Sequence, residues 1–292
     1  DIDKLLGKLF REEQIYRIDH YLAKEMIQNI LSFRFSNNLF EEIWNREHIE
    51  SIDISLHESI GVEHRGSFYD GIGALRDVGQ NHLLEMLALV TMDHPQNLES
   101  NAIRKERAVI LAYLERFKKG DVMKRSFRAQ YQGYQAIAGV RANSNTETYF
   151  LIKTFLSAPR WEGVPITLES GKRMGKARKE IVVTLKHPMP CLCPQETAEH
   201  YKNKIIFSLE PREGITIQFW SKKPGLEFAM EERDFNFFLR KEKASAQYIE
   251  EYEKLLLDAI AGDQMLFLST DEVSAMWAFI DPIIAAWEQN AA

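Results

Sequence analysis

The stretch Thr146-Glu-Thr-Tyr-Phe-Leu-Ile-Lys-Thr-Phe-Leu156 is rich in β-branched and aromatic residues, which favour a β-strand. Similar runs, each bounded by glycine, proline or charged turns, follow at residues 165–168, 181–185, 205–209 and 215–220. Consecutive strands separated by such turns are typical of an antiparallel sheet. The second half of the chain is therefore predicted to form one large, mostly antiparallel sheet.

The first half of the chain and its C-terminal part show the apolar spacing of helices instead. Residues 1–18 read as a short helix leading into a short strand, and residues 49–56 alternate as a further strand. Helices are predicted over residues 22–44, 75–91, 101–117, 246–260 and 270–287, with a glycine-marked loop over 61–73. Helices segregated from a run of strands favour the α+β class. We predict a single domain with helices packed on one side of the sheet.

Charge and cysteine content exclude several classes of protein. The chain has 292 residues and a formal net charge of -6, which argues against a general nucleic-acid or membrane-surface binder. The longest apolar run, near residues 83–92, is too short to span a bilayer. The two cysteines, Cys191 and Cys193, are too few for a disulfide framework. We therefore expect a cytoplasmic protein with neither nucleic acid nor membrane as a partner.

Two local stretches carry side chains that could bind other ligands. Residues 104–141 contain 10 basic and 3 acidic residues with interleaved aromatics, and we interpret the first third of this stretch as an amphipathic helix with a solvated basic face. His187, Cys191, Cys193 and His200 could bind a metal, but structural zinc motifs usually space their cysteines more widely. We interpret the second stretch as a surface loop and expect no metal.

The most informative segment is Arg17-Ile-Asp-His-Tyr-Leu-Ala-Lys-Glu25. If a helix begins just after Asp19, His20 and Lys24 both lie over its first turn, where unpaired backbone N–H groups favour an anion. A phosphate would fit there. A His/Lys pair alone is equally compatible with an ordinary capped helix start whose charges are solvated.

The string Asp19-His-Tyr-Leu-Ala-Lys-Glu25 resembles the active-site signature of the glucose-6-phosphate dehydrogenase family, with Ala23 where the family usually has glycine. Further motifs follow in the family's order along nearly the whole chain: Asn45-Arg-x-His-Ile49, Gly61-Val-Glu-x-Arg-Gly66, Tyr69-Asp70, Arg76-Asp-x-x-Gln-Asn-His-Leu-Leu84, Arg160-Trp-x-Gly-Val-Pro165, Gly171-Lys172 and Lys222-Lys-Pro-Gly225. Such a collinear series is far more specific than one motif.

The resemblance implies the oxidation of D-glucose 6-phosphate to 6-phosphogluconolactone with NADP, the first step of the pentose phosphate pathway. A dehydrogenase of this kind must remove the C1 hydroxyl proton as hydride leaves C1, and histidine suits that task near neutral pH. The resemblance assigns the catalytic base to His82 and the orienting carboxylate to Asp19. It also implies a homo-oligomer, a dimer or tetramer assembled through the sheet.

The resemblance also implies a set of substrate-binding residues. His20, Tyr21 and Lys24 would bind the 6-phosphate and neighbouring hydroxyls, while Glu58 and Asp77 would accept hydrogen bonds from the sugar. Lys172 resembles a further substrate-contacting lysine. The family's nearby arginine is assigned here to Arg178, with Lys176 as the fallback. Glu210 stands where the family usually has glutamine, so it either keeps a sugar contact or repels the phosphate.

No coenzyme site is expected in this chain. The family's coenzyme domain opens with a strand and a Gly-rich turn onto a helix, and Gly71-Ile-Gly73 lacks both the third glycine and a surrounding βαβ unit. We therefore interpret residues 17–292 as the C-terminal, substrate-binding domain and residues 1–16 as the end of a coenzyme domain that lies outside the sequence. The alternative is a catalytically silent sugar-phosphate-binding or oligomerisation module.

Overall fold

The computed structural model describes residues 2–187, 190, 201–239 and 249–289. Its main feature is an eight-stranded sheet with the order β3-β4-β5-β2-β6-β7-β8-β9, in which only the pair β2 and β5 is parallel. The strands are β2 Ile49–His57, β3 Ser126–Ala129, β4 Tyr149–Thr154, β5 Ile166–Gly171, β6 Arg178–Leu185, β7 Lys204–Glu210, β8 Gly214–Lys222 and β9 Met230–Phe238. The predicted large, mostly antiparallel sheet is thereby confirmed.

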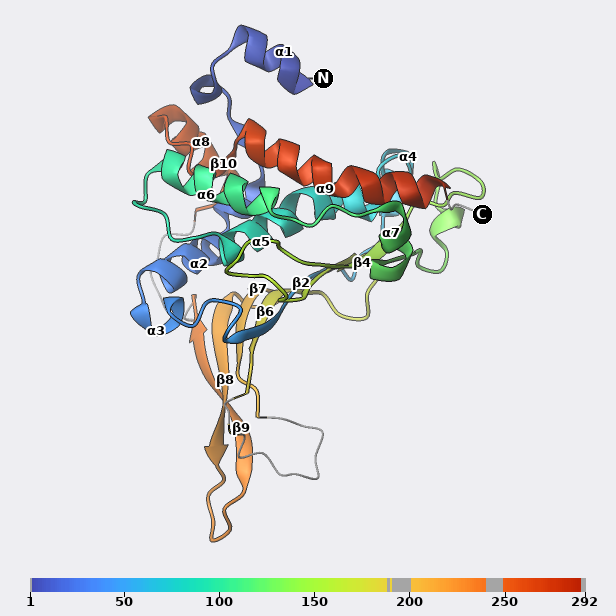
Figure 1. Ribbon diagram of the computed structural model, residues 1–292. Helices are drawn as coiled ribbons and strands as arrows, with labels where there is room; N and C mark the ends of the chain where they lie inside the picture. Colours follow the sequence, from blue (N-terminus) through green and yellow to red (C-terminus); the bar gives the residue numbers. More distant parts are fainter. Residues whose placement is uncertain (1, 188–189, 191–200, 240–248, 290–292) are drawn as a thin grey trace.

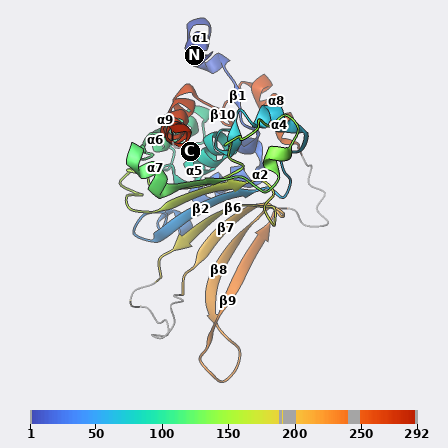
Figure 2. The same ribbon diagram turned by 90° about the vertical axis from the view of Figure 1, so that its right-hand side faces the viewer.

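The helices form a layer on one face of this sheet, over β2 to β6, while β8 and β9 extend well beyond that layer (Figures 1 and 2). They are α1 Ile2–Leu9, α2 Glu25–Phe35, α3 Asn38–Glu41, α4 Gly66–Tyr69, the π-helix η4 Leu75–Leu83, α5 Leu84–Thr91, α6 Ser100–Ala112, α7 Lys119–Arg125, α8 Glu251–Ala261 and α9 Thr270–Gln289. Short 3-10 turns are η1 Glu12–Gln14, η2 His20–Ala23, η3 Glu63–Arg65 and η5 Tyr134–Ala136. The α+β architecture is therefore as predicted.

Alternation along the central strands decides which residues enter the core. In β2, Ile52, Ile54 and Leu56 are buried beneath the helices, as are Ile181 and Val183 in β6. Because successive side chains of a strand point to opposite faces, the residues between them lie on the other face of the sheet. The same alternation decides which charged residues at the ends of these strands can reach the helical layer.

Three side chains from other elements hold the C-terminal end of α5. Helices leave their last carbonyl groups without intrahelical partners. Here Arg34 Nη1 donates to the Leu89 carbonyl at 3.0 Å, and the buried indoles of Trp44 and Trp161 donate to the next two carbonyls at 2.7 and 2.6 Å. The helix that continues from η4 is thus anchored in a single orientation against the sheet.

The predicted long helix over residues 22–44 is wrong, because the chain forms η2, α2 and α3 in its place. Asp19 caps η2 by accepting a hydrogen bond from the backbone N–H of Tyr21, and Lys24 adopts an extended conformation before α2 begins. At the other end, the Asn37 side chain donates to the carbonyls of Ser32 and Phe33. Such local side-chain bonds compete with continued helix, so α2 ends at Phe35.

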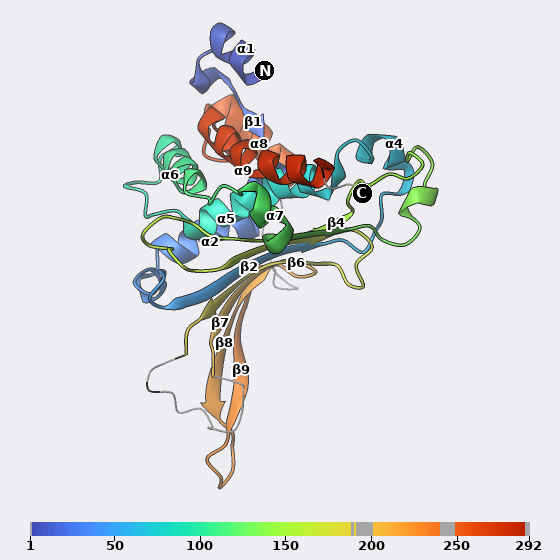
Figure 3. The same cartoon turned by 45° about the vertical axis from the view of Figure 1, so that its right-hand side comes forward.

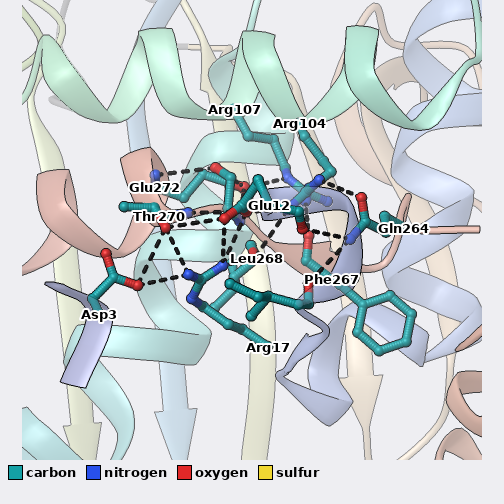
Figure 4. A network of polar contacts seen from close by, with 12 residues as sticks. Asp3, Glu12, Arg17, Arg104, Arg107, Gln264, Phe267, Leu268, Thr270 and Glu272 are labelled. Atoms are coloured by element: carbon teal, nitrogen blue, oxygen red, sulfur yellow. Dashed lines mark hydrogen bonds and ion pairs between the residues drawn. The ribbon is translucent and has the colours of Figure 1, made fainter. Parts of the chain in front are cut away.

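The polar network in Figure 4 corrects a second expectation, the solvated basic face of the helix at 104–117. Arg104 and Arg107 of α6 are buried. Arg104 donates to Gln264 at 2.8 Å and to Glu12 at 2.7 Å, and Arg107 donates to Glu272 of α9 at 2.6 Å. These arginines therefore join α6 to α9 and to the N-terminal segment, and do not form a surface for nucleic acid.

The same network fixes the segment that precedes the site. Arg17 lies in β1, Arg17–Ile18, which pairs antiparallel with β10, Phe267–Leu268. Its guanidinium donates to Asp3 and Thr270, both at 2.6 Å (Figure 4). Asp19 follows directly, so its position depends on this small sheet and its arginine.

Several elements were not predicted from the sequence. They are α7, β3, β9, β10, η5 and the helical turns η3 and α4 inside the predicted loop. The start of β9 reads Met-Glu-Glu-Arg-Asp, which has no apolar alternation, and most of this edge strand is exposed. Cys191, Cys193 and His200 lie outside the described residues. Among the residues described, no helix combines the length and apolar character needed to cross a membrane.

Candidate active site

The site forms at one end of the sheet, where β2 and β5 run parallel. Leu56 of β2 pairs with Ser170 of β5, so Glu58 and Lys172 come just after the carboxyl ends of neighbouring strands. Figure 3 shows β2 crossing the sheet beneath the helical layer. The buried Lys172 ammonium donates to the Glu58 carboxylate. Parallel pairing thus brings together two residues that are distant in sequence.

The π-helix η4 adds Asp77 and His82 to this end of the sheet. Its i→i+5 hydrogen bonds place residues five apart above one another, whereas an ordinary α-helix would turn them apart. Asp77 Oδ2 lies 3.7 Å from Lys172 Nζ, and its other oxygen lies 4.0 Å from Arg65. The segment was predicted to be an ordinary helix, and the π-helical geometry is what aligns Asp77 with His82.

His82 and Asp19 form a hydrogen-bonded pair. His82 Nδ1 lies 2.6 Å from Asp19 Oδ2, and the carboxylate is only 4% exposed. Burial alone would raise the pKa of Asp19, but the hydrogen bond and charge of His82 and the Tyr21 N–H outweigh it and lower that pKa. Since Asp19 stays ionised, it orients Nδ1–H toward itself and leaves the Nε2 lone pair to accept a proton.

Aromatic rings fix the plane of the imidazole. Tyr21 stacks on His82 with ring centroids 3.9 Å apart and an interplanar angle of 18°. His20 approaches the same ring edge-on at 5.0 Å. Burial, followed by the nearby His82, lowers the pKa of His20, so His20 favours its neutral form.

Lys24 and His20 face the N-terminal end of α8. Lys24 Nζ donates to Glu251 at 2.8 Å, and the Tyr252 ring stacks on His20 with centroids 5.9 Å apart. Burial would lower the pKa of Lys24, but the hydrogen bond with Glu251 reverses this and raises it. Lys24 is therefore a fixed cation beside Tyr21.

Lys179 is a site residue that we did not predict. Its ammonium lies 2.8 Å from Glu210 and 5.8 Å above the Tyr21 ring, and it interacts with the Tyr21 hydroxyl. The sequence contains a signal for this placement. Lys179 is two and four residues before Ile181 and Val183, so it lies on the same, core-facing side of β6. Glu210 is paired with this lysine, so its charge is locally compensated.

The structure does not bring Arg178 to this cluster. Arg178 pairs in register with His57, and its guanidinium lies 3.3 Å from Glu180, on the face of the sheet opposite to Lys179. Lys176, the fallback, is exposed in the turn before β6. All other predicted site residues lie at this end of the sheet: His82, Asp19, His20, Tyr21, Lys24, Glu58, Asp77 and Lys172.

Neither a metal site nor a dinucleotide site follows from the arrangement of these side chains. Asp19, His20 and His82 place potential ligand atoms within 4.8 Å of one another, but the His82–Asp19 hydrogen bond already accounts for that proximity. Gly71-Ile-Gly73 follows the short helix α4, so no strand leads into it. Within the described ranges, these residues do not form the strand, Gly-rich turn and helix that would fit a nicotinamide dinucleotide.

Two family models match the chain. "Glucose-6-phosphate dehydrogenase, C-terminal domain" matches residues 31–292. "Glucose-6-phosphate dehydrogenase, NAD binding domain" matches residues 1–29.

Curated relatives and solved structures agree with these matches. Glucose-6-phosphate 1-dehydrogenase of Aggregatibacter actinomycetemcomitans is 42% identical over 97% of this chain and 58% of its own length, and that of Borreliella burgdorferi is 37% identical over 98% and 62%. The chain therefore spans about three fifths of the curated relatives it matches. A glucose-6-phosphate dehydrogenase solved in complex with its substrate glucose-6-phosphate superposes with a TM-score of 0.89 at 30% identity, covering 98% of this chain and 59% of that one.

Proposed function

Because the chain belongs to the glucose-6-phosphate dehydrogenase family, we propose that it is the substrate-binding and catalytic-base domain of an enzyme that oxidises D-glucose 6-phosphate to 6-phosphogluconolactone. The observation that carries this proposal is the 2.6 Å contact between His82 Nδ1 and the buried Asp19 carboxylate. A histidine oriented by a carboxylate is the arrangement that proton abstraction from a hydroxyl requires.

His82 acts as the base in this proposal. Its Nε2 takes the proton from the C1 hydroxyl while the C1–H bond breaks and a carbonyl forms at C1. The Asp19 carboxylate stabilises the imidazolium that results. NADP bound to a coenzyme domain would supply the hydride acceptor for this step. The stack of Tyr21 on His82 keeps the imidazole in one plane during the transfer.

The phosphate is assigned to the cations next to Tyr21. Lys24 and Lys179 both lie near this ring, at 5.3 and 5.8 Å from its centroid. Two ammonium groups near one phenol ring can supply the charge-assisted hydrogen bonds that a phosphate dianion prefers. His20, which contacts the Tyr21 ring edge-on, is a further donor.

The sugar hydroxyls are assigned to Glu58, Asp77 and Lys172. Lys172 lies between the two carboxylates, so its positive charge offsets the repulsion between them. Because Asp77 and His82 share a face of η4, a sugar held by this group would present one of its carbons to His82. Arg178 is not part of this proposal, and Lys179 takes its place.

Domain limits and assembly belong to the proposal as well. We propose residues 1–16 as the end of a coenzyme domain and residues 17–292 as the substrate domain. The match of the NAD binding domain model supports the first assignment but extends to residue 29, and the C-terminal domain model begins at residue 31. Exposed aromatics on β9, such as Phe235 and Phe237, support a homo-oligomer formed through the sheet. Sedimentation velocity tests this assembly, and a purely monomeric protein at micromolar concentration would contradict it.

The function is tested in two steps. Thermal unfolding of this chain is measured with glucose 6-phosphate and, as a control, with glucose. We expect stabilisation by the phosphate ester alone, because only a ligand that binds the folded state raises the unfolding temperature. Reduction of NADP is then measured in an enzyme that contains both this chain and a coenzyme domain. Binding without turnover would support the silent module instead.

A further inference from the structure

Glu85 of α5 lies about one turn after His82 and is an unusual residue for the core, because its carboxyl group is buried without a donor in the part of the chain that the structure describes. Its side chain is 1% exposed, and neither carboxylate oxygen accepts a hydrogen bond from any N–H or O–H of the described residues. An ionised carboxylate buried without donors costs several kcal/mol, so such a group keeps its proton instead. The mechanism proposed above does not use this residue.

The charged groups around Glu85 do not supply a counter-ion. They are His82 on the same helical segment, Asp19 before η2, Arg107 on α6 and Glu272 on α9. Arg107 Nε is committed to Glu272 at 2.6 Å, and its two other nitrogens donate to backbone carbonyls at 2.9 Å. Burial, followed by the charge of Asp19, raises the pKa of Glu85 well above its usual range.

Asp19 is the partner that a protonated Glu85 can satisfy. Its Oδ1 accepts the Tyr21 N–H at 2.8 Å and its Oδ2 accepts from His82 at 2.6 Å. An ionised carboxylate offers about four lone-pair sites, so it can accept a third hydrogen bond. A hydrogen bond between the two carboxyl groups would favour a proton on Glu85 and a charge on Asp19, which is the direction in which the two pKa values are shifted.

We propose that Glu85 is a positioning residue that keeps its proton at neutral pH and donates a hydrogen bond to Asp19, forming a Glu85–Asp19–His82 chain. This inference rests on the proposed function, because it assumes that His82 is the base. The hydrogen bond fixes the Asp19 carboxylate and spreads its charge. Asp19 therefore stabilises the imidazolium less strongly than it would without this hydrogen bond.

The pH dependence of kcat/KM separates this role from simple packing. Glu85→Leu removes the donor and keeps an apolar side chain, so the acid limb of the profile should move up by about 0.5 to 1 pH unit. Glu85→Gln is the matched control, because its amide N–H donates to Asp19 and should preserve the wild-type profile. Superimposable profiles for Glu85→Leu and wild type, or an equal shift in Glu85→Gln, would overturn the proposal.

A second measurement uses this chain alone and does not depend on turnover. A protonated carboxyl group gives a carboxylic-acid C=O stretch in the infrared spectrum at neutral pH. We expect this band in the wild type and in Asp19→Asn, and its loss in Glu85→Gln. A wild-type spectrum without the band would show that Glu85 is ionised and end the proposal, even if His82 proves to be the base. An active His82→Asn enzyme would instead refute the proposed function and leave the infrared result standing.

Discussion

Arg178 and Lys179 are adjacent in β6, yet their side chains lie on opposite faces of the sheet. Lys179 reaches Tyr21 and Glu210 on the helical side, whereas Arg178 lies beside Glu180 on the other side. The period of two along a strand makes this separation unavoidable. Substituting each residue in turn therefore removes the same charge from opposite faces of the sheet.

We predict that Lys179→Met raises the KM for glucose 6-phosphate by about 10- to 100-fold, since a hydrogen bond to a charged group contributes about 1.5–3 kcal/mol. Arg178→Met, which removes the same charge from the opposite face, should change KM by less than about twofold. Steady-state kinetics with glucose 6-phosphate as the varied substrate measures both. A larger effect in Arg178→Met would reverse the assignment.

His82→Asn should act on the chemical step. Asparagine cannot take up the C1 hydroxyl proton, so kcat should fall by at least about 100-fold while KM changes little. His48→Asn is the matched control, because His48 is exposed and, among the described residues, its ring forms a hydrogen bond only with Asn45. Turnover in His82→Asn close to that of the control would remove His82 from the role of base.

The parts of the site that follow from local pattern were predictable, and those that depend on distant partners were not. Alternation with Ile181 and Val183 already assigns Lys179 to the core face of β6. By contrast, the apolar residues of 75–91 recur at ordinary helical spacing, and nothing local indicates the π-helical turn that brings Asp77 and His82 to one face. The resemblance to a family assigned both residues to one site, and the structure supplied the geometry that joins them.

The buried arginines show the same limit. Arg104 and Arg107 occur in a basic stretch, where charge alone suggests a solvated face. Their partners Gln264 and Glu272 are about 160 residues away in the chain, so only the packing of α6 on α9 makes the arginines internal. A charged side chain is rarely buried unless it is paired with a partner. Sequence spacing does not show which distant residue will be that partner.

Asp70 should make the free energy of unfolding depend on pH in the acid range. It accepts hydrogen bonds from Tyr134, Ser144 and Arg141. Burial would raise its pKa, but these hydrogen bonds outweigh burial and lower it to about 2. Because the folded-state pKa is below the unfolded value, this stabilisation is present above about pH 4 and is lost as pH falls toward 2.

Urea unfolding between pH 2 and 6 measures this contribution. The free energy of unfolding of Asp70→Asn should fall less steeply between about pH 4 and 2 than that of the wild type, since the variant has no carboxylate to protonate. Asp53→Asn is a suitable control because the Asp53 carboxylate contacts only Ser51 in the hydrogen bonds described. Parallel curves for Asp70→Asn and wild type would contradict the assignment.

Glu251 and the substrate phosphate are expected to compete for Lys24. The Lys24–Glu251 ion pair, at 2.8 Å, occupies the ammonium that we assign to the phosphate. Lys24→Ala should therefore raise the KM for glucose 6-phosphate by about 10-fold or more. Glu251→Gln should lower KM by up to about fivefold, since the partly exposed pair that the phosphate must disrupt is worth at most about 1 kcal/mol.

The matched control for Glu251→Gln is Glu162→Gln. Glu162 forms an ion pair with Arg46 at 2.7 Å near the start of β2, at the end of the sheet away from Glu58, so this variant removes one charge without touching the site. Its KM should equal that of the wild type. Because opposite effects are expected from the two partners of one ion pair, a rise in KM for Glu251→Gln would mean that Glu251 positions Lys24 for the phosphate and does not compete with it.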